Sequence, residues 1–547
     1  MISEAKNKLT YLIIGSAVIN TLVITPFFNK DAIVIPKLII VFCTALYLLP
    51  IIYLNRRIIF KSKLLKIFVF LNITLFLQSL IVLILSSAPI EQQVFGRSGR
   101  GLGLITIFSL SIASITVAIL YDEIIDEKVI QGLILSGFIT SLYSILQSFG
   151  IDFLKWDSKT NGVIGTLGNP NFQSAFAAMI LIPSLLYTWK NQKGVYFSIL
   201  LFSFFVYTIY RTQSTQGIVA GFFSIVVITI IYLWYKNKKV FLLAILSGVF
   251  SSILTIAGML NVGLLSDYLY KVSIQSRGDF WRSALNTANA HPFFGVGLDS
   301  FGDYSLKYRD LTAVNHPFAE YTDNAHNFFL EQAATGGYIF AVFNLVIALL
   351  VVYSFFKIQS CNKKFEPKIA SLFGSWVAFQ MTSVISPGSL VTMFWNALIS
   401  GIIIGQAASI SSNYDKNSEA KRNNSRNLQG VLLGILGFAI LFPLFNTDRN
   451  LLTGMQNKDA NLVIKAVTSY PESTVRYSII GQELLQSGLN IQALEVARSG
   501  VKFNPHSAGL WALVLVNPSA TLEERNYAKI QILELDPLNK EVRNFTP

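Results

Sequence analysis

The feature that most constrains this chain is a succession of long apolar runs separated by short polar connections. A helix needs about 20 apolar residues to cross the hydrocarbon core of a bilayer. Because backbone polar groups find no water there, such runs fold as helices. We predict an all-α, polytopic membrane protein with about thirteen spanning helices. The predicted spans are 10–28, 33–54, 64–87, 102–121, 129–148, 173–189, 194–210, 217–235, 240–260, 337–356, 369–387, 390–408 and 429–446.

Composition supports a membrane protein over a soluble one. Hydrophobic residues make up 52% of the chain and charged residues 13%, whereas soluble domains carry about 25% charged residues. The predicted spans hold almost no ionisable side chains, which argues against an ion-coupled transporter. Cys43 and Cys361 lie in an apolar run and in a basic connection, so no disulfide framework is expected.

Lysine and arginine gather in alternate connections between the runs, which is the pattern that orients membrane proteins. For this reason we do not read the net charge of +13 as a sign of nucleic acid binding. The start "MISEAKNKL" is expected to be retained as part of the first helix. We predict a multi-pass protein of the cytoplasmic (inner) membrane, with a cytoplasmic N-terminus and an extracytoplasmic C-terminus. The basic connections are 56–63, 190–193, 236–239, 357–364 and 421–426, and the acidic connection 121–128 belongs to the same set.

The glycine-rich and polar motifs all fall in the other set of connections, which this orientation places outside the cytoplasm. The largest is an extracytoplasmic loop at 261–336. The others are "FGRSGRG" (95–101), "NGVIGTLGNPNF" (161–172), "RTQSTQG" (211–217) and "SPGS" (386–389).

The last hundred or so residues have a different pattern. Pro471, Pro505 and Pro537 recur at spacings of 34 and 32 residues between amphipathic stretches, which is typical of tetratricopeptide-like helical repeats. We therefore predict a transmembrane domain at 1–446 and a repeat domain at 447–547 that binds a protein partner. A generic helical tail is the alternative.

Two residues near the start of the large loop suggest a binding surface. Arg277 and Trp281 are four residues apart, so they share one face of a helix. A guanidinium beside an indole at a membrane surface suits an anionic, partly apolar ligand. The alternative is an interfacial anchor with a snorkelling arginine. Further along, "HPFFGVG" (291–297) predicts a helix end and a turn in which Gly295 and Gly297 allow close approach of another segment.

The end of the loop, "TDNAHNFFLEQ", contains one of the four histidines of the chain. We expect Asn324 and His326 at a helix start, capped by Asp323 or Asn324. A helix N-terminus lowers the pKa of a nearby histidine and favours the neutral ring, which can act as a general base. The alternative is a structural histidine that hydrogen-bonds a loop.

A metal site is not expected, although several ligand types occur close together in this loop. His316, His326, Asp303, Glu320 and Asp323 are near one another in sequence, but they do not show the spacing of a known metal motif. The chain also lacks a P-loop, a dinucleotide-binding fingerprint and a Gly-x-Ser-x-Gly motif. We therefore expect no cofactor.

Taken together, these motifs resemble the O-antigen ligase superfamily, which includes O-antigen ligases, Wzy-type polymerases and bacterial protein O-oligosaccharyltransferases. The matching segments are "SRGDFW..AL.....HPFFGVGLDSF" (276–301), "DNAHNFFLEQAATGGY" (323–338), "GTLGNPN" (165–171) and "FGRSGRGLGL" (95–104). The resemblance covers most of the membrane domain and is strongest from about 160 to 340.

The resemblance implies a metal-independent, inverting glycosyltransferase with a GT-C-like helical fold. It implies transfer of a glycan from an undecaprenyl-diphosphate carrier to a glycan, lipid or protein acceptor, on the outer face of the membrane. Arg277 matches the family arginine of the large loop, and His326 matches the essential histidine of the "HN" motif. Trp281, Asn324 and Asn327 lie beside these two as candidate substrate contacts.

One departure from the family concerns the second arginine expected to hold the diphosphate. Many relatives carry Ser-Arg-Gly at the start of the span after "RTQSTQG", where this chain has "STQG" at 214–217. Arg211 and Arg100 are the candidates to replace it.

Three reactions of the superfamily remain open: O-antigen ligation, polymerisation and protein glycosylation. They share the donor and differ in the acceptor. The alternative from another class is a non-enzymatic protein, either a flippase for lipid-linked sugars or a scaffold. A flippase is expected to have a basic lumen within its spans, and a scaffold has no need of the Arg277 and His326 pair.

Overall fold

The computed structural model describes residues 2–154, 156, 162–187, 192–259, 262–269, 272–315, 321–411 and 424–546. Every regular element within these residues is a helix, so the prediction of an all-α polytopic membrane protein is confirmed.

Each predicted span overlaps one long helix of the described part. Nine of these helices are long and apolar enough to cross a membrane, and three others contain shorter apolar stretches of 10–17 residues. The count of thirteen crossings therefore stays a prediction. The long helices are α1 (Ile2–Leu22), α2 (Val34–Leu54), α4 (Lys63–Leu85), α6 (Leu104–Leu120), α7 (Glu123–Ser148), α8 (Pro170–Leu186), α9 (Gln192–Arg211), α10 (Thr215–Lys236), α11 (Lys238–Met259), α16 (Phe328–Asn362), α17 (Pro367–Ile385), α18 (Leu390–Ser411) and α19 (Asn424–Asn457).

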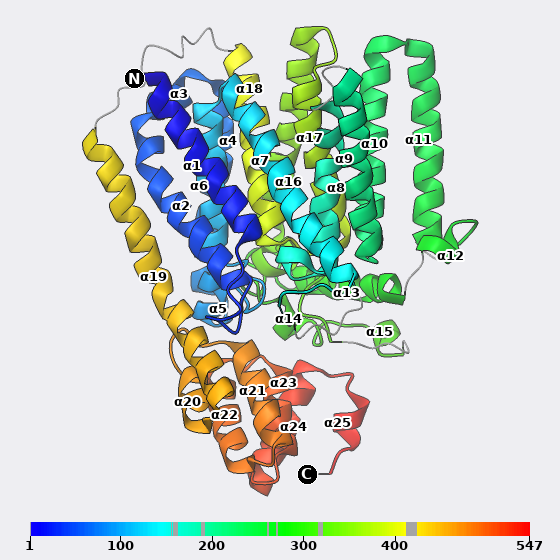
Figure 1. The fold of residues 1–547 in the computed structure, drawn as a ribbon. Helices are drawn as coiled ribbons and strands as arrows, with labels where there is room; N and C mark the ends of the chain where they lie inside the picture. The colour runs from blue at the N-terminus through cyan, green and yellow to red at the C-terminus, as the bar shows by residue number, and fades with distance from the viewer. Residues whose placement is uncertain are drawn as a thin grey trace.

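The short helices gather at the two ends of this bundle (Figure 1). The helix α3 lies at the end where the chain begins, together with the α10–α11 connection. The helices of the large loop and α5 lie at the opposite end, next to the C-terminal helices. The helices of the large loop and the helix that precedes the "FGRSGRG" motif thus share one end of the molecule. The short elements are α3 (Arg56–Lys61), α5 (Ile90–Phe95), η1 (Gly165–Leu167), α12 (Ser266–Leu269), α14 (Phe301–Tyr304) and α15 (Leu311–Asn315). The large loop also contains the longer helix α13 (Val272–Ala290).

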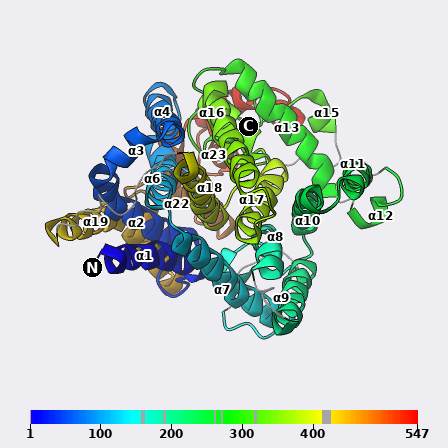
Figure 2. The same ribbon diagram turned by 90° about the horizontal axis from the view of Figure 1, so that it is seen from above.

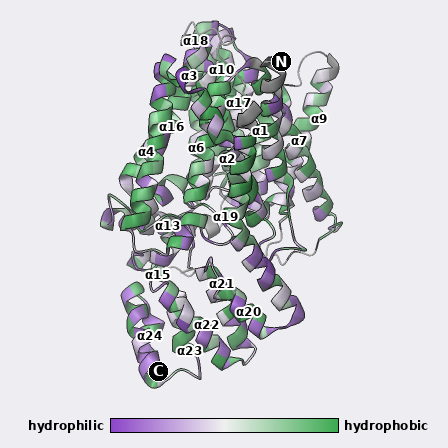
Figure 3. Ribbon diagram, turned by 90° about the vertical axis from the view of Figure 1, so that its left-hand side faces the viewer, coloured by the Kyte–Doolittle hydropathy of each residue, from purple (hydrophilic) through white to green (hydrophobic). Residues whose placement is uncertain are grey.

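Hydrophobic residues hold the bundle together and also coat it. One large cluster of buried apolar side chains spans most of the long helices. Seen from above, α11 lies at one edge beside α10 and α19 lies at another beside α2 (Figure 2). Hydrophobic residues run through the bundle, whereas the C-terminal helices show more hydrophilic ones (Figure 3). An apolar outer surface on the bundle is what a bilayer requires.

Local signals explain where several helices begin. The side chain of Asp122 accepts hydrogen bonds from the backbone of the first turn of α7, and Asn169 does the same for α8. Pro170 occupies the first turn of α8, where its missing N–H costs nothing. The "GTLGNPN" motif is therefore a helix start.

One buried cation inside the bundle was not singled out from the sequence. Lys37 of α2 is 2% exposed. Its Nζ donates hydrogen bonds to the carbonyl oxygens of Asn20, Thr21 and Val23 at 2.9, 3.2 and 2.9 Å. These carbonyls belong to the end of α1, where a cation satisfies groups that have no partner within the helix. Lys37 thus ties α1 to α2.

Two long helices extend beyond their predicted spans. The helix α19 continues to Asn457, past the predicted domain boundary at 446, which stays a prediction. The helix α16 begins at Phe328, and its backbone breaks at Gly337 with φ 82° and ψ 169°. The predicted span began at 337, so it coincides with the second, straight part of α16.

The C-terminal helices pack as neighbours in sequence. The helices α21 and α22 contact each other, as do α23 and α24. Pro471, Pro505 and Pro537 each come shortly before the start of α21, α23 and α25, which supports a helical repeat of this spacing. Its identity as a tetratricopeptide array stays a prediction. The helices are α20 (Ala460–Val467), α21 (Thr474–Gln486), α22 (Asn490–Phe503), α23 (Ala508–Val516), α24 (Leu522–Leu535) and α25 (Lys540–Asn544).

Candidate functional site

The helix α13 brings the first two predicted site residues together, as their spacing indicated. Arg277 and Trp281 are one turn apart on this helix, and Arg277 is 8% exposed. The indole Nε1 of Trp281 donates a hydrogen bond of 3.4 Å to the carbonyl oxygen of His326. Trp281 therefore links α13 to the turn that carries the predicted histidine.

That turn is shaped by side chains that bond their own backbone. The Asn324 Oδ1 accepts a hydrogen bond of 2.8 Å from the His326 backbone N–H, which is an Asx turn. His326 itself has a φ of 49°, a conformation that is uncommon for any residue other than glycine. Such strain persists where the surroundings fix the backbone, and functional sites are common places for it.

The predicted cap of the following helix is wrong. The helix α16 begins at Phe328, and Asn327 caps it by accepting a hydrogen bond of 3.1 Å from the Leu330 N–H. Asn324 shapes the turn instead, and its Nδ2 donates to the carboxylate of Asp323. His326 therefore lies just before the helix rather than in its first turn.

The His326 ring is packed against another aromatic ring and is largely buried. It stacks on the ring of Phe280 with centroids 5.6 Å apart, and its Nδ1 is buried without a hydrogen-bond partner. Burial lowers the pKa of His326 to about 4, helped by the charges of Arg277 and Arg100 and opposed by Asp323. The pKa of His326 is lowered as expected, but burial is the main cause and the helix N-terminus is not among the causes.

Arg277 is a buried cation that has no counter-charge among the described residues. Among the residues that the structure describes, no carboxylate lies within ion-pairing distance of its guanidinium. Burial lowers the pKa of Arg277 to about 10, so the side chain stays charged at neutral pH. Leaving a charge buried and unpaired is costly, and an anionic ligand would remove that cost.

The kink in α16 fixes the large loop against the membrane helices. The N–H groups of Val296 and Gly297 donate to the carbonyl oxygens of Ala334 and Thr335 at 2.9 and 3.0 Å. Gly295 has a φ of 61°, and a Cβ at this position would lie 2.3 Å from the backbone of Thr335. The predicted close approach at these glycines is confirmed, and its partner is the kinked start of α16.

The "FGRSGRG" loop also reaches the histidine turn, through Arg100. The Nε of Arg100 lies 3.4 Å from Asp299, and its Nη2 lies 3.7 Å from Glu331. Its Nη1 donates a hydrogen bond of 3.1 Å to the carbonyl oxygen of Asp323. Arg100 thus lies at the site, but these acidic partners already engage its guanidinium.

Arg97 of the same loop was not predicted as a site residue. It forms an ion pair of 3.0 Å with Asp303 and donates a hydrogen bond of 2.7 Å to the hydroxyl of Tyr321. Burial disfavours its charge, but the charge and hydrogen bond of Asp303, together with Tyr321 and Asp323, outweigh this and raise the pKa of Arg97. One feature of the sequence could have indicated Arg97, Asp299 and Asp303. Charged residues are scarce in this chain, and these three lie in the "FGRSGRG" loop and in the large loop.

Arg211 lies at the end of α9, against the end of α7. Its Nη2 donates a hydrogen bond of 2.7 Å to the Ser148 carbonyl oxygen, and its guanidinium lies over the Phe149 ring. In the described part of the chain, no hydrogen bond or ion pair joins Arg211 to Arg277 or His326. Its predicted substrate contact stays a prediction.

A cavity between the membrane helices opens beside the histidine turn. It contains about 970 Å³ of empty space including its mouth, and α4, α6, α16, α17 and α18 surround it. Phe328, Phe329 and Gln332, from the first turns of α16, line it, and so does Leu102, which closely follows Arg100. Apolar side chains predominate in its wall, with a few amides such as Asn72 and Asn344.

The candidate metal ligands of the large loop lie only partly within the described residues. Within the described ranges, no group of three or more histidine, cysteine, aspartate or glutamate side chains is placed to hold a metal ion. His316 and Glu320, two of the residues weighed as ligands, lie outside the described residues.

The fold and the site define a multi-pass helical membrane protein. Beside a largely apolar cavity it has a buried arginine without a carboxylate partner among the described residues and a histidine whose pKa is lowered. Residues 197–345 match the family model described as O-antigen ligase. The matched segment contains α13, Arg277 and His326. This match supports the resemblance to the O-antigen ligase superfamily and a glycan-transferring function of the ligase or polymerase type. That family implies lipid-linked glycan and acceptor substrates in a membrane. No curated protein matches the chain.

Proposed function

We propose that this protein transfers a glycan from an undecaprenyl-diphosphate carrier to an acceptor hydroxyl, on the outer face of the cytoplasmic membrane. The observation that carries the proposal is the buried Arg277, which has no carboxylate partner in the described chain and lies beside His326. In an interior with few charges, such a cation is a binding site for an anion.

The donor diphosphate fits Arg277 in both charge and geometry. A guanidinium can donate two parallel hydrogen bonds to phosphate oxygens, and its charge stabilises the negative charge that develops on the leaving group. The cavity that begins at Phe328 suits the polyprenyl chain of the donor, since it is largely apolar and lies between the membrane helices. The head and the tail of one donor thus have adjacent places.

His326 is the candidate general base. In the reaction, the acceptor oxygen forms a bond to the anomeric carbon as the bond to the diphosphate breaks, and the hydroxyl proton passes to the imidazole. Attack opposite the diphosphate inverts the anomeric configuration. The Nδ1 of His326 is buried and has no hydrogen-bond partner in the described chain, so no described protein group competes with the acceptor hydroxyl for it.

Donor binding also improves the base. A pKa of about 4 makes His326 a weak base in the empty site, and the Arg277 charge contributes to that low value. A bound diphosphate offsets this charge, so we expect the pKa of His326 to rise toward the pH at which a general base works best. The base is therefore strongest when the donor is in place.

The remaining candidates have supporting roles in this proposal. Trp281, Asn324 and Asn327 hold the histidine turn through the contacts described above. Arg100 and Arg211 remain candidates for a second diphosphate contact. The reaction as proposed draws on side chains alone, without a metal or a cofactor.

The test is a transfer assay with the full-length protein in liposomes and a purified lipid-linked glycan donor. We expect Arg277→Ala to lower transfer by about 10²–10³-fold, as when a donor to a developing oxyanion is removed. Arg282→Ala is the matched control, because Arg282 lies on the same helix but is 43% exposed and paired with Asp279 and Asp310. Full transfer by Arg277→Ala would disprove the proposal.

The same assay separates the three possible acceptors. Mass spectrometry of the products after offering lipid A core, a lipid-linked glycan and a protein distinguishes ligation, polymerisation and protein glycosylation. Transbilayer movement of the donor without any glycosylated product would instead support the flippase alternative. Reporter fusions after residue 450 test the proposed orientation, which predicts an extracytoplasmic signal.

A further inference from the structure

The C-terminal helices reach the transfer site through one buried asparagine. Asn504 follows the end of α22 and is 0% exposed. Its Nδ2 donates hydrogen bonds of 2.9 Å to the Asp303 carboxylate in the large loop and to the Thr474 hydroxyl at the start of α21. A side chain of the C-terminal helices thus holds a carboxylate that belongs to the membrane-domain loops.

A closed set of hydrogen bonds surrounds this contact. Gln92 of α5 donates a hydrogen bond of 2.9 Å to the same Asp303 oxygen. The Thr474 hydroxyl donates one of 3.0 Å to the Gln92 side-chain oxygen. Asn504, Asp303, Gln92 and Thr474 therefore form a ring across the junction, which satisfies these buried polar groups together.

From Asp303 the contacts continue to the histidine turn. The other Asp303 oxygen pairs with Arg97 at 3.0 Å. Arg97 in turn donates a hydrogen bond of 2.7 Å to the hydroxyl of Tyr321, which lies five residues before His326. Three polar contacts thus separate the C-terminal helices from the segment that carries the proposed base.

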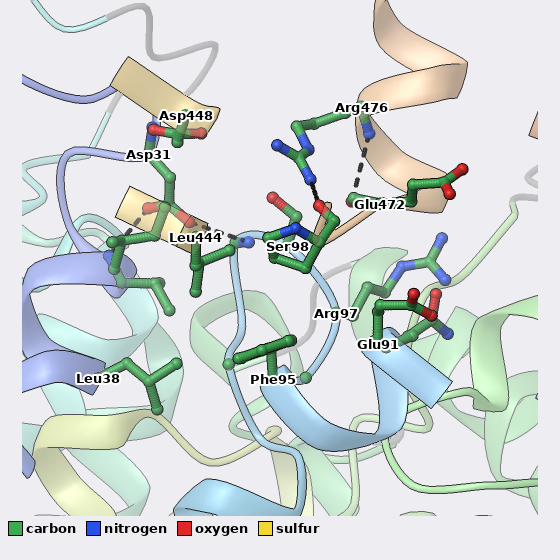
Figure 4. A pocket seen from close by; sticks show the side chains of 18 residues that line it. Asp31, Leu38, Glu91, Phe95, Arg97, Ser98, Leu444, Asp448, Glu472 and Arg476 are labelled. Carbon is green, nitrogen blue, oxygen red and sulfur yellow. Dashed lines mark hydrogen bonds between the residues drawn. The ribbon is translucent and has the colours of Figure 1, made fainter. Parts of the chain in front are cut away.

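Other contacts also join the two parts: Arg309 of the large loop pairs with Asp536, and the Tyr304 ring stacks on that of His506. A cavity with both apolar and charged side chains in its wall opens at the junction, between α2, the "FGRSGRG" loop, α19 and the start of α21 (Figure 4). Asp31, Asp448 and Arg476 line it, and Arg97 lies at its edge. The apolar clusters of the C-terminal helices contain buried residues from position 451 onward and none from the large loop. Hydrogen bonds, an ion pair and ring contacts therefore join the two parts, and Asn504 makes the contact that reaches Asp303.

We propose that Asn504 is a positioning residue of the transfer site, which holds Asp303 and, through Arg97, the turn that carries His326. This positioning role rests on the proposed function only where its test measures glycan transfer. The C-terminal helices would then have a role in catalysis besides any binding of a partner. Their packing against the membrane domain fixes the positions of the site residues.

The test compares Asn504→Ala with Asn517→Ala in the full-length protein. Asn517 is a matched control, because it is 1% exposed and its Nδ2 donates a hydrogen bond of 2.9 Å to the Asn490 carbonyl oxygen within the C-terminal helices. Amide hydrogen exchange of peptides covering 321–327 is the first readout. We expect faster exchange in Asn504→Ala and exchange like that of the wild type in Asn517→Ala.

Kinetics supply the second readout. A displaced base lowers kcat by about tenfold to a hundredfold, while the KM for the donor stays near the wild-type value because Arg277 is untouched. Water that enters the loosened turn raises the pKa of His326, so the acid limb of the kcat profile moves to higher pH. The charged groups that face the ring are Arg277, Arg100 and Asp323. Asn504→Asp is expected to have a larger effect than the alanine variant, since it places a second carboxylate against Asp303.

The outcomes distinguish this inference from the proposed function. Unchanged exchange at 321–327 and unchanged kcat in Asn504→Ala, with an active wild type, overturn the positioning role alone. A wild type that transfers no glycan, with exchange that still differs between the two variants, overturns the proposed function and leaves the coupling intact. Equal acceleration of exchange in both variants means general destabilisation and also overturns the positioning role.

Discussion

The "FGRSGRG" loop and helix α13 both bury arginine at the same end of the bundle, but in opposite electrostatic settings. The side chain of Arg97 is 7% exposed and pairs with Asp303. Arg277 is 8% exposed and has no such partner among the described residues. Pairing raises the pKa of Arg97 against the effect of burial, whereas burial alone lowers that of Arg277.

This difference separates arginines that hold the protein together from one that is available to a substrate. A buried charge with a carboxylate partner gives the structure a defined register, and removing its partner is costly. A buried charge without a partner destabilises the empty protein and gains free energy when an anion binds. The second arrangement is a reason to look for function, because a purely structural role does not explain it.

The largest effect is expected at His326. His326→Ala is predicted to lower glycan transfer by about 10²–10⁴-fold, the usual contribution of a general base, with little change in the melting temperature. His291→Ala is the control, since His291 lies in the same large loop and bonds the Tyr308 hydroxyl. Transfer rates in liposomes measure both variants. Equal losses in the two would mean that His326 is structural.

The next largest effect concerns Arg97, the arginine of the comparison that has a carboxylate partner. Arg97→Ala leaves Asp303 buried without its cation, and breaking such a pair typically costs about 3–5 kcal/mol. We predict a lower melting temperature in detergent, together with faster proteolysis in the loops. Arg277→Ala, measured in parallel without donor, should melt at or above the wild-type temperature. A marked loss of stability in Arg277→Ala would remove the distinction between the two arginines.

A smaller effect concerns the titration of His326. Arg277→Gln removes a positive neighbour, so the pKa of His326 should rise from about 4, and Asp323→Asn should lower it. Burial persists in both, so the ring should stay more acidic than a free histidine. Labelling with diethyl pyrocarbonate across a pH series, read by peptide mass spectrometry, reports the neutral fraction. Shifts in the opposite directions would contradict the geometry of the site.

The same low pKa has a consequence for stability. An unfolded histidine takes up a proton near pH 6.5, whereas folded His326 takes it up only near pH 4. Between these values the unfolded chain binds more protons, so stability falls as the pH falls through this window. His326→Gln should reduce this acid sensitivity. A stability curve that keeps its wild-type slope between pH 6.5 and 4 in that variant would speak against the buried neutral ring.

Much of the fold could be predicted because it depends on local pattern. Apolar runs marked the membrane helices, and the α13 periodicity put Arg277 and Trp281 on one face. Gly295 indicated a close approach, although its partner at Thr335 could not be read from the sequence. Helix limits were less certain, since α16 begins at Phe328 before its apolar stretch.

The pairing of charges could not be predicted, since it depends on contacts between distant segments. Asp303 meets Arg97 across about two hundred residues of sequence and meets Asn504 across as many again. The sequence therefore offered Arg100 as a candidate diphosphate contact, without its acidic partners, and gave no reason to choose Arg97. The dry stacking of His326 on Phe280 likewise follows only from the packing of α13 against the turn.

The most direct test of the comparison is donor binding at equilibrium, measured with a purified lipid diphosphate glycan on the wild type, Arg277→Gln and Arg100→Gln. Arg277 is predicted to make the dominant contact to the donor diphosphate. Arg277→Gln should therefore raise the Kd by about 10–100-fold, in line with about 1.5–3 kcal/mol for a hydrogen bond to a charged group. Arg100→Gln should mainly lower the melting temperature, because Arg100 holds Asp299, Glu331 and the Asp323 carbonyl. An unchanged Kd in Arg277→Gln would contradict the account.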